Sequence, residues 1–130
     1  MEVLSKDKTL LSSPDVEVKV EFLNNTECLV FEFRGHFSRE VCENATKAWK
    51  NYFDEQMKNE FVIVWDCLQM DGFDYDAKNE WAETLSKYAD RIRTINVISS
   101  SVLIRGAARL MGKFSKYDLR VFKSYEEFGN

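Results

Sequence analysis

The residues of this chain that could do chemistry include four aspartates, Asp66, Asp71, Asp74 and Asp76, which fall within eleven residues. Carboxylates so spaced can bind a hard cation such as Ca²⁺. The loop pattern of an EF-hand is not met, because Gly72 precedes the last two aspartates and no glutamate follows at the required offset. We expect Asp74 or Asp76 instead to cap a helix, where the helix dipole favours negative charge.

A histidine and a cysteine are the other candidates for catalysis. His36 is the only histidine, and Cys67 directly follows Asp66. A general base must reach the proton it removes, and a nucleophilic cysteine needs a base and an anion-stabilising site. The neighbouring sequence supplies neither. We therefore expect no enzymatic activity, no metal and no cofactor, with His36 structural or exposed and Cys67 small and buried.

A serine run offers a candidate anion-binding site. Ser99, Ser100 and Ser101 precede a helical pattern in which Arg105 lies one turn further on and Arg109 continues the same face. Free N–H groups at a helix N-terminus favour phosphate, so these five residues are the predicted anion site. The alternative is an ordinary cap followed by a solvated basic stripe. The sequence contains neither a Walker loop nor a G-x-G-x-x-G motif.

Composition indicates one soluble domain. The chain has 130 residues, of which 45% are hydrophobic and 31% charged, an ordinary globular balance. No apolar run approaches the ~20 residues of a membrane span, and the first residues do not resemble a signal peptide. Three cysteines without a C-x-x-C pair fit free thiols and a cytoplasmic location. Residues 1–15 are expected to form a loose leader, or an extra edge strand around Val3 and Leu4, and residues 16–130 the domain.

Charge is unevenly distributed along the chain. Residues 91–123 hold eight basic residues and one acidic residue, so this part carries +7 and the rest −11 of the net −4. Such a split predicts a polarised surface, unless the two sets offset each other across the fold. The acidic isoelectric point and the lack of clustered exposed aromatic residues argue against nucleic acid as a partner.

The elements that must position these residues begin with a hairpin. Residues 16–22 alternate apolar and charged side chains, which predicts a half-buried strand. Asn24 and Asn25 supply turn residues. A second strand is predicted over residues 28–34, ending at Gly35.

Three strand–helix units are predicted to follow. The expected elements are a helix after Ser38, a strand over 61–65 with Asp66 opening a loop, a helix from about Asp76, a strand over 92–98, a helix after Ser101, a strand over 119–122 and a helical turn after Ser124. Trp49 and Trp81 should pack on the sheet. The inward face of the third helix should consist of Leu103, Ala107, Leu110, Met111 and Phe114. The strand over 61–65 is apolar on both faces and should be central. This order predicts an α/β fold with a mixed sheet of four to five strands and helices packed on it.

The stretch over residues 61–77 also carries a family resemblance. A strand ending in Asp66 precedes a helix opened by Asp74, Tyr75, Asp76 and Ala77. The layout resembles the STAS family, the bacterial anti-sigma-factor antagonists and their relatives, whose helix opens with Asp-Ser-Ser-Gly. It is most similar to the SpoIIAA-like branch, whose members often lack the serines. Arg34–Gly35 at the hairpin end, the strand–Ser–helix over residues 95–105 and the end over residues 121–127 carry the same resemblance.

The resemblance implies a STAS-like fold over residues 16–128 and a non-enzymatic regulatory domain that acts by protein–protein contact. In the antagonists, the surface around the Asp-Ser-Ser-Gly helix docks on an anti-sigma kinase, and phosphorylation of the second serine blocks docking. Tyr75 and Asp76 stand at the serine positions here, so no serine switch is expected. The predicted partner-binding residues are Tyr75, Asp76, Lys78 and Asn79, beside the third-helix face with Arg105 and Arg109.

The alternative is a module of the same fold that binds an anionic or lipid-like small molecule, since lipid-carrier domains share a related architecture. A ligand carrier should contain an enclosed apolar pocket. A partner-binding module should have a filled core and an exposed patch. The sequence does not identify the partner, and a homodimer is compatible with it.

Overall fold

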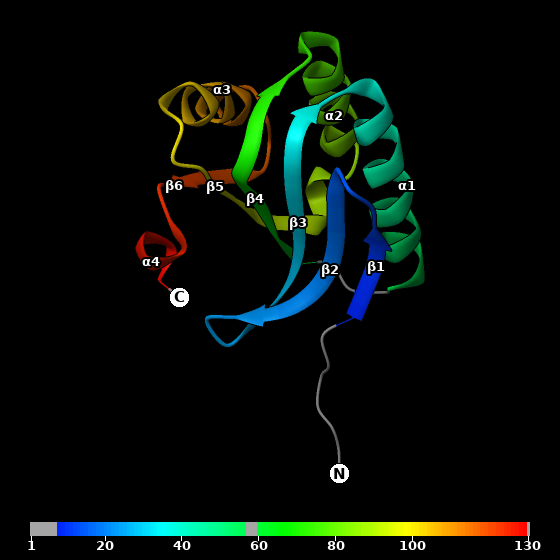
Figure 1. Ribbon diagram of the computed structural model, residues 1–130. Helices are drawn as coiled ribbons and strands as arrows, with labels where there is room; N and C mark the ends of the chain where they lie inside the picture. Colours follow the sequence, from blue (N-terminus) through cyan, green and yellow to red (C-terminus); the bar gives the residue numbers. More distant parts are fainter. Residues whose placement is uncertain (1–7, 57–59, 130) are drawn as a thin grey trace.

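Six strands form one sheet in the computed structural model, which describes residues 8–56 and 60–129 (Figure 1). They are β1 (Lys8–Ser12), β2 (Val16–Leu23), β3 (Thr26–Phe37), β4 (Phe61–Phe73), β5 (Ile92–Ile98) and β6 (Asp118–Phe122), in that spatial order. Strands β1 to β3 pair antiparallel, and β3 to β6 pair parallel. The predicted mixed sheet is confirmed, with six strands instead of four or five. The possible strand around Val3 and Leu4 lies outside the described residues.

The helices are α1 (Arg39–Glu55), α2 (Tyr75–Ser86), α3 (Val102–Lys113) and the single turn α4 (Tyr125–Phe128), with a 3₁₀ turn, η1 (Ala89–Arg91), before β5. Serines cap three of them. The Oγ atoms of Ser38, Ser101 and Ser124 each accept a hydrogen bond from the backbone N–H three residues on, which satisfies a donor that the helix itself cannot. These starts agree with the sequence prediction.

Strand β4 is central, between β3 and β5, as predicted. Its core-facing residues Phe61, Ile63 and Trp65 pack with Trp49 of α1 and Trp81 of α2 in one hydrophobic cluster, all of them buried. Trp81 makes ring contacts with Phe31, Phe33, Phe37, Trp49 and Trp65 at centroid distances of 5.4, 5.8, 5.6, 6.5 and 5.9 Å. The predicted packing role of both tryptophans is confirmed.

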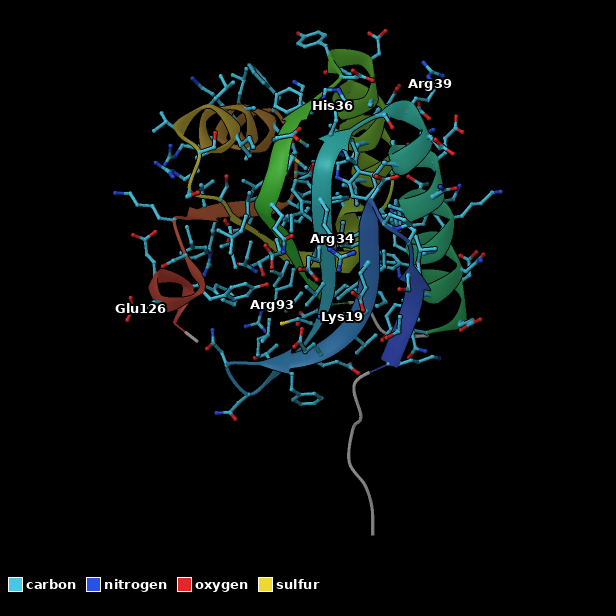
Figure 2. All side chains as sticks on the ribbon, viewed as in Figure 1. Lys19, Arg34, His36, Arg39, Arg93 and Glu126 are labelled. Atoms are coloured by element: carbon cyan, nitrogen blue, oxygen red, sulfur yellow. The ribbon has the colours of Figure 1, made fainter. Side chains whose placement is uncertain are left out.

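The two faces of the sheet differ. Helices α1, α2 and α3 contribute to the main cluster on one face, while α4 packs a smaller cluster on the other. The rest of that second face is polar. Arg34 Nη2 lies 2.9 Å from Glu17 Oε1 and 3.1 Å from Glu32 Oε1, and Figure 2 shows Arg34 and Lys19 on this part of the sheet. Most apolar residues of the sheet and helices therefore lie on the face that α1, α2 and α3 cover.

The predicted ends of two strands are wrong. Asp66 does not open a loop, and Gly35 does not end the hairpin, because β3 and β4 stay paired as far as Phe37 and Phe73. The pairing passes through two irregularities, between Glu32 and Arg34 and between Gly35 and His36. Gly35 has φ +74°, which favours glycine at such a bulge. Bulges break the alternation of apolar and polar residues, so the strands continue through a polar sequence.

The predicted inward face of α3 is wrong at Leu103, Leu110 and Phe114, whereas Met111 packs against the core cluster as predicted. The buried residues of this helix are Ile104, Arg105 and Ala108. Leu103, Leu110 and Phe114 are 76%, 53% and 80% exposed. The helix is apolar around more of its circumference than the sheet can cover, so spacing alone could not decide which stripe faces the core.

Candidate functional site

A groove between α2 and α3 contains three exposed large apolar residues, Tyr75, Leu110 and Phe114. Its volume is ≈ 360 Å³. The α2 wall consists of residues spaced three and four apart, Tyr75, Lys78, Asn79, Ala82, Glu83 and Ser86, and the other wall of Leu110, Met111, Phe114, Ser115 and Tyr117. The spacing on α2 places these side chains on one helical face. The groove therefore runs along the length of α2 and the C-terminal half of α3.

The α3 side of the groove is an apolar stripe. Leu110 and Phe114 line the groove, and Leu103 and Ala107 continue their stripe toward the start of α3, outside the groove lining. Tyr75 across the groove is 69% exposed. A contiguous exposed apolar patch of this kind indicates an interaction site more often than a stabilising feature.

Three of the four predicted partner-binding residues, Tyr75, Lys78 and Asn79, line this groove. The ammonium of Lys78 lies 4.8 Å from the centroid of the Tyr75 ring, a cation–π distance. Asp76 is exposed in the first turn of α2 and is absent from the groove lining. The structure thus groups the predicted residues with an α3 wall that the sequence assigned to the core.

The start of α2 is held by a contact that sequence reasoning missed. His36 Nε2 lies 2.7 Å from Asp74 Oδ1, and the backbone N–H of Asp74 donates to the carbonyl of Phe37 at 2.9 Å. Asp74 occupies the N-cap position, but its side chain makes no capping hydrogen bond. The capping role expected of Asp74 is wrong, since its carboxylate contacts His36 instead. The two residues are 38 positions apart, so only the pairing of β3 with β4 brings them together.

The predicted anion site has a different geometry from the one expected. Ser99 Oγ accepts from the N–H of Ser101, and Ser101 Oγ accepts from the N–H of Ile104. Arg105 is buried, and its Nη1 donates to the carbonyl of Ser99 at 2.9 Å, so the alternative of a solvated basic stripe does not hold at this residue. Ser100 and Arg109 are exposed. Anion binding stays a prediction.

A small apolar cavity lies beneath the groove. Its volume is ≈ 50 Å³, and its lining includes Phe33, Trp65, Cys67 and Trp81. Lys78 and Met111 line both the cavity and the groove, so they separate the two spaces. The cavity is far smaller than the roughly 300–1,000 Å³ of typical small-molecule sites.

The buried thiols and Asp66 have structural roles. All three cysteines are buried. Burial raises the pKa of the Cys42 thiol to about 11 and also raises the pKa of Cys67 above its ordinary value, which disfavours the nucleophilic thiolate. Asp66 accepts from the N–H of Leu68 and from the hydroxyl of Tyr125.

Residues 8–56 and 60–129 contain neither a metal-binding cluster nor a membrane-spanning helix. No group of three or more His, Cys, Asp or Glu side chains there could hold a metal ion. None of the helices in this part of the chain has the length and apolar character needed to cross a membrane.

The fold is that of SpoIIAA-like proteins. The crystal structure of a DUF3478-family protein of Shewanella loihica PV-4, described as uncharacterised and as having a SpoIIAA-like fold, superposes on this chain with a TM-score of 0.73. The two sequences are 18% identical, and the match covers 91% of this chain and 96% of the other. No family model and no curated protein matches the sequence. The resemblance seen in the sequence is therefore confirmed as a shared fold.

Proposed function

We propose that this chain is a cytoplasmic, non-enzymatic regulatory module that binds a protein partner in the α2–α3 groove. The observation that carries the proposal is the exposure of Phe114, Leu110 and Tyr75, at 80%, 53% and 69%, around one groove. Large aromatic and aliphatic side chains at the centre of an interface supply most of its binding energy. In water the same side chains stabilise nothing, so a partner accounts for them better than folding does.

Two observations support a protein partner over a small ligand. The apolar cavity of ≈ 50 Å³ is too small for a lipid-like molecule, while the groove of ≈ 360 Å³ opens to solvent beside the exposed side chains of Tyr75 and Phe114. Within the described residues, the two candidates for catalysis, His36 and Cys67, form no base–nucleophile pair. His36 is hydrogen bonded to Asp74, and the Cys67 thiol is buried. These features favour contact, not chemistry, as the mode of action.

The test compares wild type and three variants of the chain as bait in an extract of its own cells. Phe114→Ser and Tyr75→Ser remove apolar surface from the groove, and Phe22→Ser is the matched control, because Phe22 is 51% exposed on β2, away from the groove. We expect wild type and Phe22→Ser to retain the same protein, quantified by mass spectrometry, and both groove variants to lose it. Equal retention by all four proteins would rule out the groove as the docking site.

A further inference from the structure

We infer that the segment seated in the groove is an amphipathic helix of the partner, with acidic side chains on one flank and basic side chains on the other. The inference rests on the proposed function and names the chemistry of the partner. It follows from the walls of the groove, the charges along its two rims and the cavity beneath it.

The composition of the groove walls favours a helical segment of the partner over an extended one. Within the part of the chain that the structure describes, the lining residues come from α2, from α3 and from the turn that follows α3, and no strand contributes. An extended segment gains affinity by pairing its backbone with a free strand edge, and here its N–H and C=O groups would find no such partner. A helix satisfies its backbone groups internally and needs only a side-chain groove. The α2 wall has 12 residues, so it spans roughly 18 Å, about three helical turns.

The rims carry opposite charges. On α2, Asp76 and Glu83 are exposed two turns apart, and Glu83 also lines the groove, while Lys78 of the same wall lies over the Tyr75 ring. On α3, Arg109 and Lys113 are exposed one turn apart, and this helix contains no acidic residue. A helix with one acidic and one basic flank complements both rims, whereas a uniformly charged helix is repelled by one of them. Such patterns fix orientation and partner choice more than raw affinity.

The apolar cavity at the floor of the groove could accept one apolar side chain of the partner helix. Met111 lies between the groove and the apolar cavity and lines both. Methionine has a flexible, unbranched side chain that repacks easily. A leucine or phenylalanine of the incoming helix that displaces Met111 would contact the cavity walls at Trp81 and Phe37. Deep, desolvated pockets of this kind hold the strongest contacts of an interface.

The inference is tested with a displayed library of random peptides of about 16 residues, which as helices span roughly 24 Å. The library is selected for binding to the full wild-type chain and, separately, to Phe114→Ser. The enrichment of each peptide is compared between the two. We expect the enriched peptides to show apolar residues at helical spacing with acidic and basic flanks, and to gain helical circular dichroism on binding. Phe114→Ser should weaken the best synthetic peptide roughly 30-fold.

Charge variants give the sharper readout. Three versions of the best peptide keep its apolar seam and carry mixed, all-acidic or all-basic flanks. Wild type should bind the mixed peptide about tenfold more tightly than either other form. Asp76→Lys with Glu83→Lys makes both rims basic, so the all-acidic peptide should become the tightest. An unchanged ranking would overturn the charge assignment.

The outcomes separate this inference from the proposed function. Enriched peptides that depend on Phe114 but bind in an extended form, or that contain proline throughout, would overturn the helix while leaving the groove as a docking site. Enrichment that is identical on wild type and Phe114→Ser would overturn both. Self-association of the chain at working concentration, lost in Phe114→Ser, would replace the partner's helix with a second copy and also overturn the inference.

Discussion

Helices α1 and α3 contribute to the same core cluster but use their apolar residues in opposite ways. The apolar stripe of α1 is buried throughout, at Val41, Cys42, Ala45, Trp49, Tyr52 and Phe53. In α3 only Ile104 and Ala108 are buried among the apolar residues, and the stripe ending at Phe114 faces solvent. Apolar surface removed from water stabilises a fold, while surface left in water is available for binding. By its burial α1 is a structural helix, and our proposal gives α3 a binding role in addition to its structural one.

The largest expected effect is on the α1 side. Phe53 is fully buried and stacks on Phe61 with a centroid distance of 3.8 Å. Phe53→Ala should lower the free energy of unfolding by roughly 3–5 kcal/mol, through lost transfer energy and the cavity left behind. Urea unfolding measures it. A loss of less than about 1 kcal/mol would remove the contrast between the helices.

Helix α4 provides an intermediate case. The Tyr125 hydroxyl donates to Asp66 Oδ2 at 2.8 Å, so Tyr125→Phe should cost about 1 kcal/mol, discounted because Asp66 is only half-buried. Burial and the Asp66 carboxylate raise the pKa of Tyr125. A raised folded pKa means that the stabilisation is complete below the unfolded pKa of about 10 and is lost as pH rises above it.

The pH dependence of stability tests the role of Tyr125 independently of the size of the loss in Tyr125→Phe. Burial also raises the pKa of Tyr52 and of Tyr117, so wild type should lose stability above about pH 10 through several tyrosines. Tyr125→Phe should show a shallower decline than wild type in alkaline urea titrations. Parallel declines would contradict the assigned role of Tyr125.

Substitutions at two glycines of α3 should change the free energy of unfolding by a smaller amount and distinguish the two faces of this helix. A Cβ at Gly106 would meet no atom within 4 Å, whereas one at Gly112 would lie 2.9 Å from Leu119 Cβ on β6. Gly106→Ala should therefore stabilise the chain by about 0.5–1 kcal/mol. Gly112→Ala should destabilise it, because the helix must move away from the sheet. Thermal unfolding of the two variants tests which face of α3 touches the protein, and opposite signs are expected.

Phe114 should show the smallest effect on stability. The side chain is 80% exposed, so Phe114→Ala should change the free energy of unfolding by less than about 0.5 kcal/mol. The matched truncation at Phe53 differs only in burial. Denaturant curves of the two variants, measured side by side, give the contrast directly. A large loss at Phe114 would mean that α3 is packed more like α1.

The sequence was sufficient for the order of elements and for the core of the central strand. Period-two alternation over β2, the asparagine turn and the serine caps are local signals. Asn24 and Asn25 indeed adopt φ values of 54° and 61°, which suit a tight hairpin turn. The tryptophans could also be assigned, because their helices have a single apolar stripe.

The sequence did not predict features that depend on contacts between distant parts of the chain. The extension of β4 to Phe73 depends on β3 continuing beside it, and the His36–Asp74 contact depends on that pairing. For α3, two overlapping apolar stripes compete for the core, and Arg105 lies on the buried side despite its charge. Tyr75, Lys78 and Asn79 were predicted from a family resemblance, but the apolar wall opposite them has no signal that distinguishes it from core.

The most direct test of the central claim is site-specific photocrosslinking in living cells. A photoreactive phenylalanine analogue replaces Phe114 in one version of the chain and Phe22 in another, since both sites expose an aromatic ring. Our account predicts that the probe at position 114 forms one dominant covalent adduct with a partner protein, and that the probe at position 22 does not. Adducts of equal yield and pattern at both positions, or none at position 114, would contradict it.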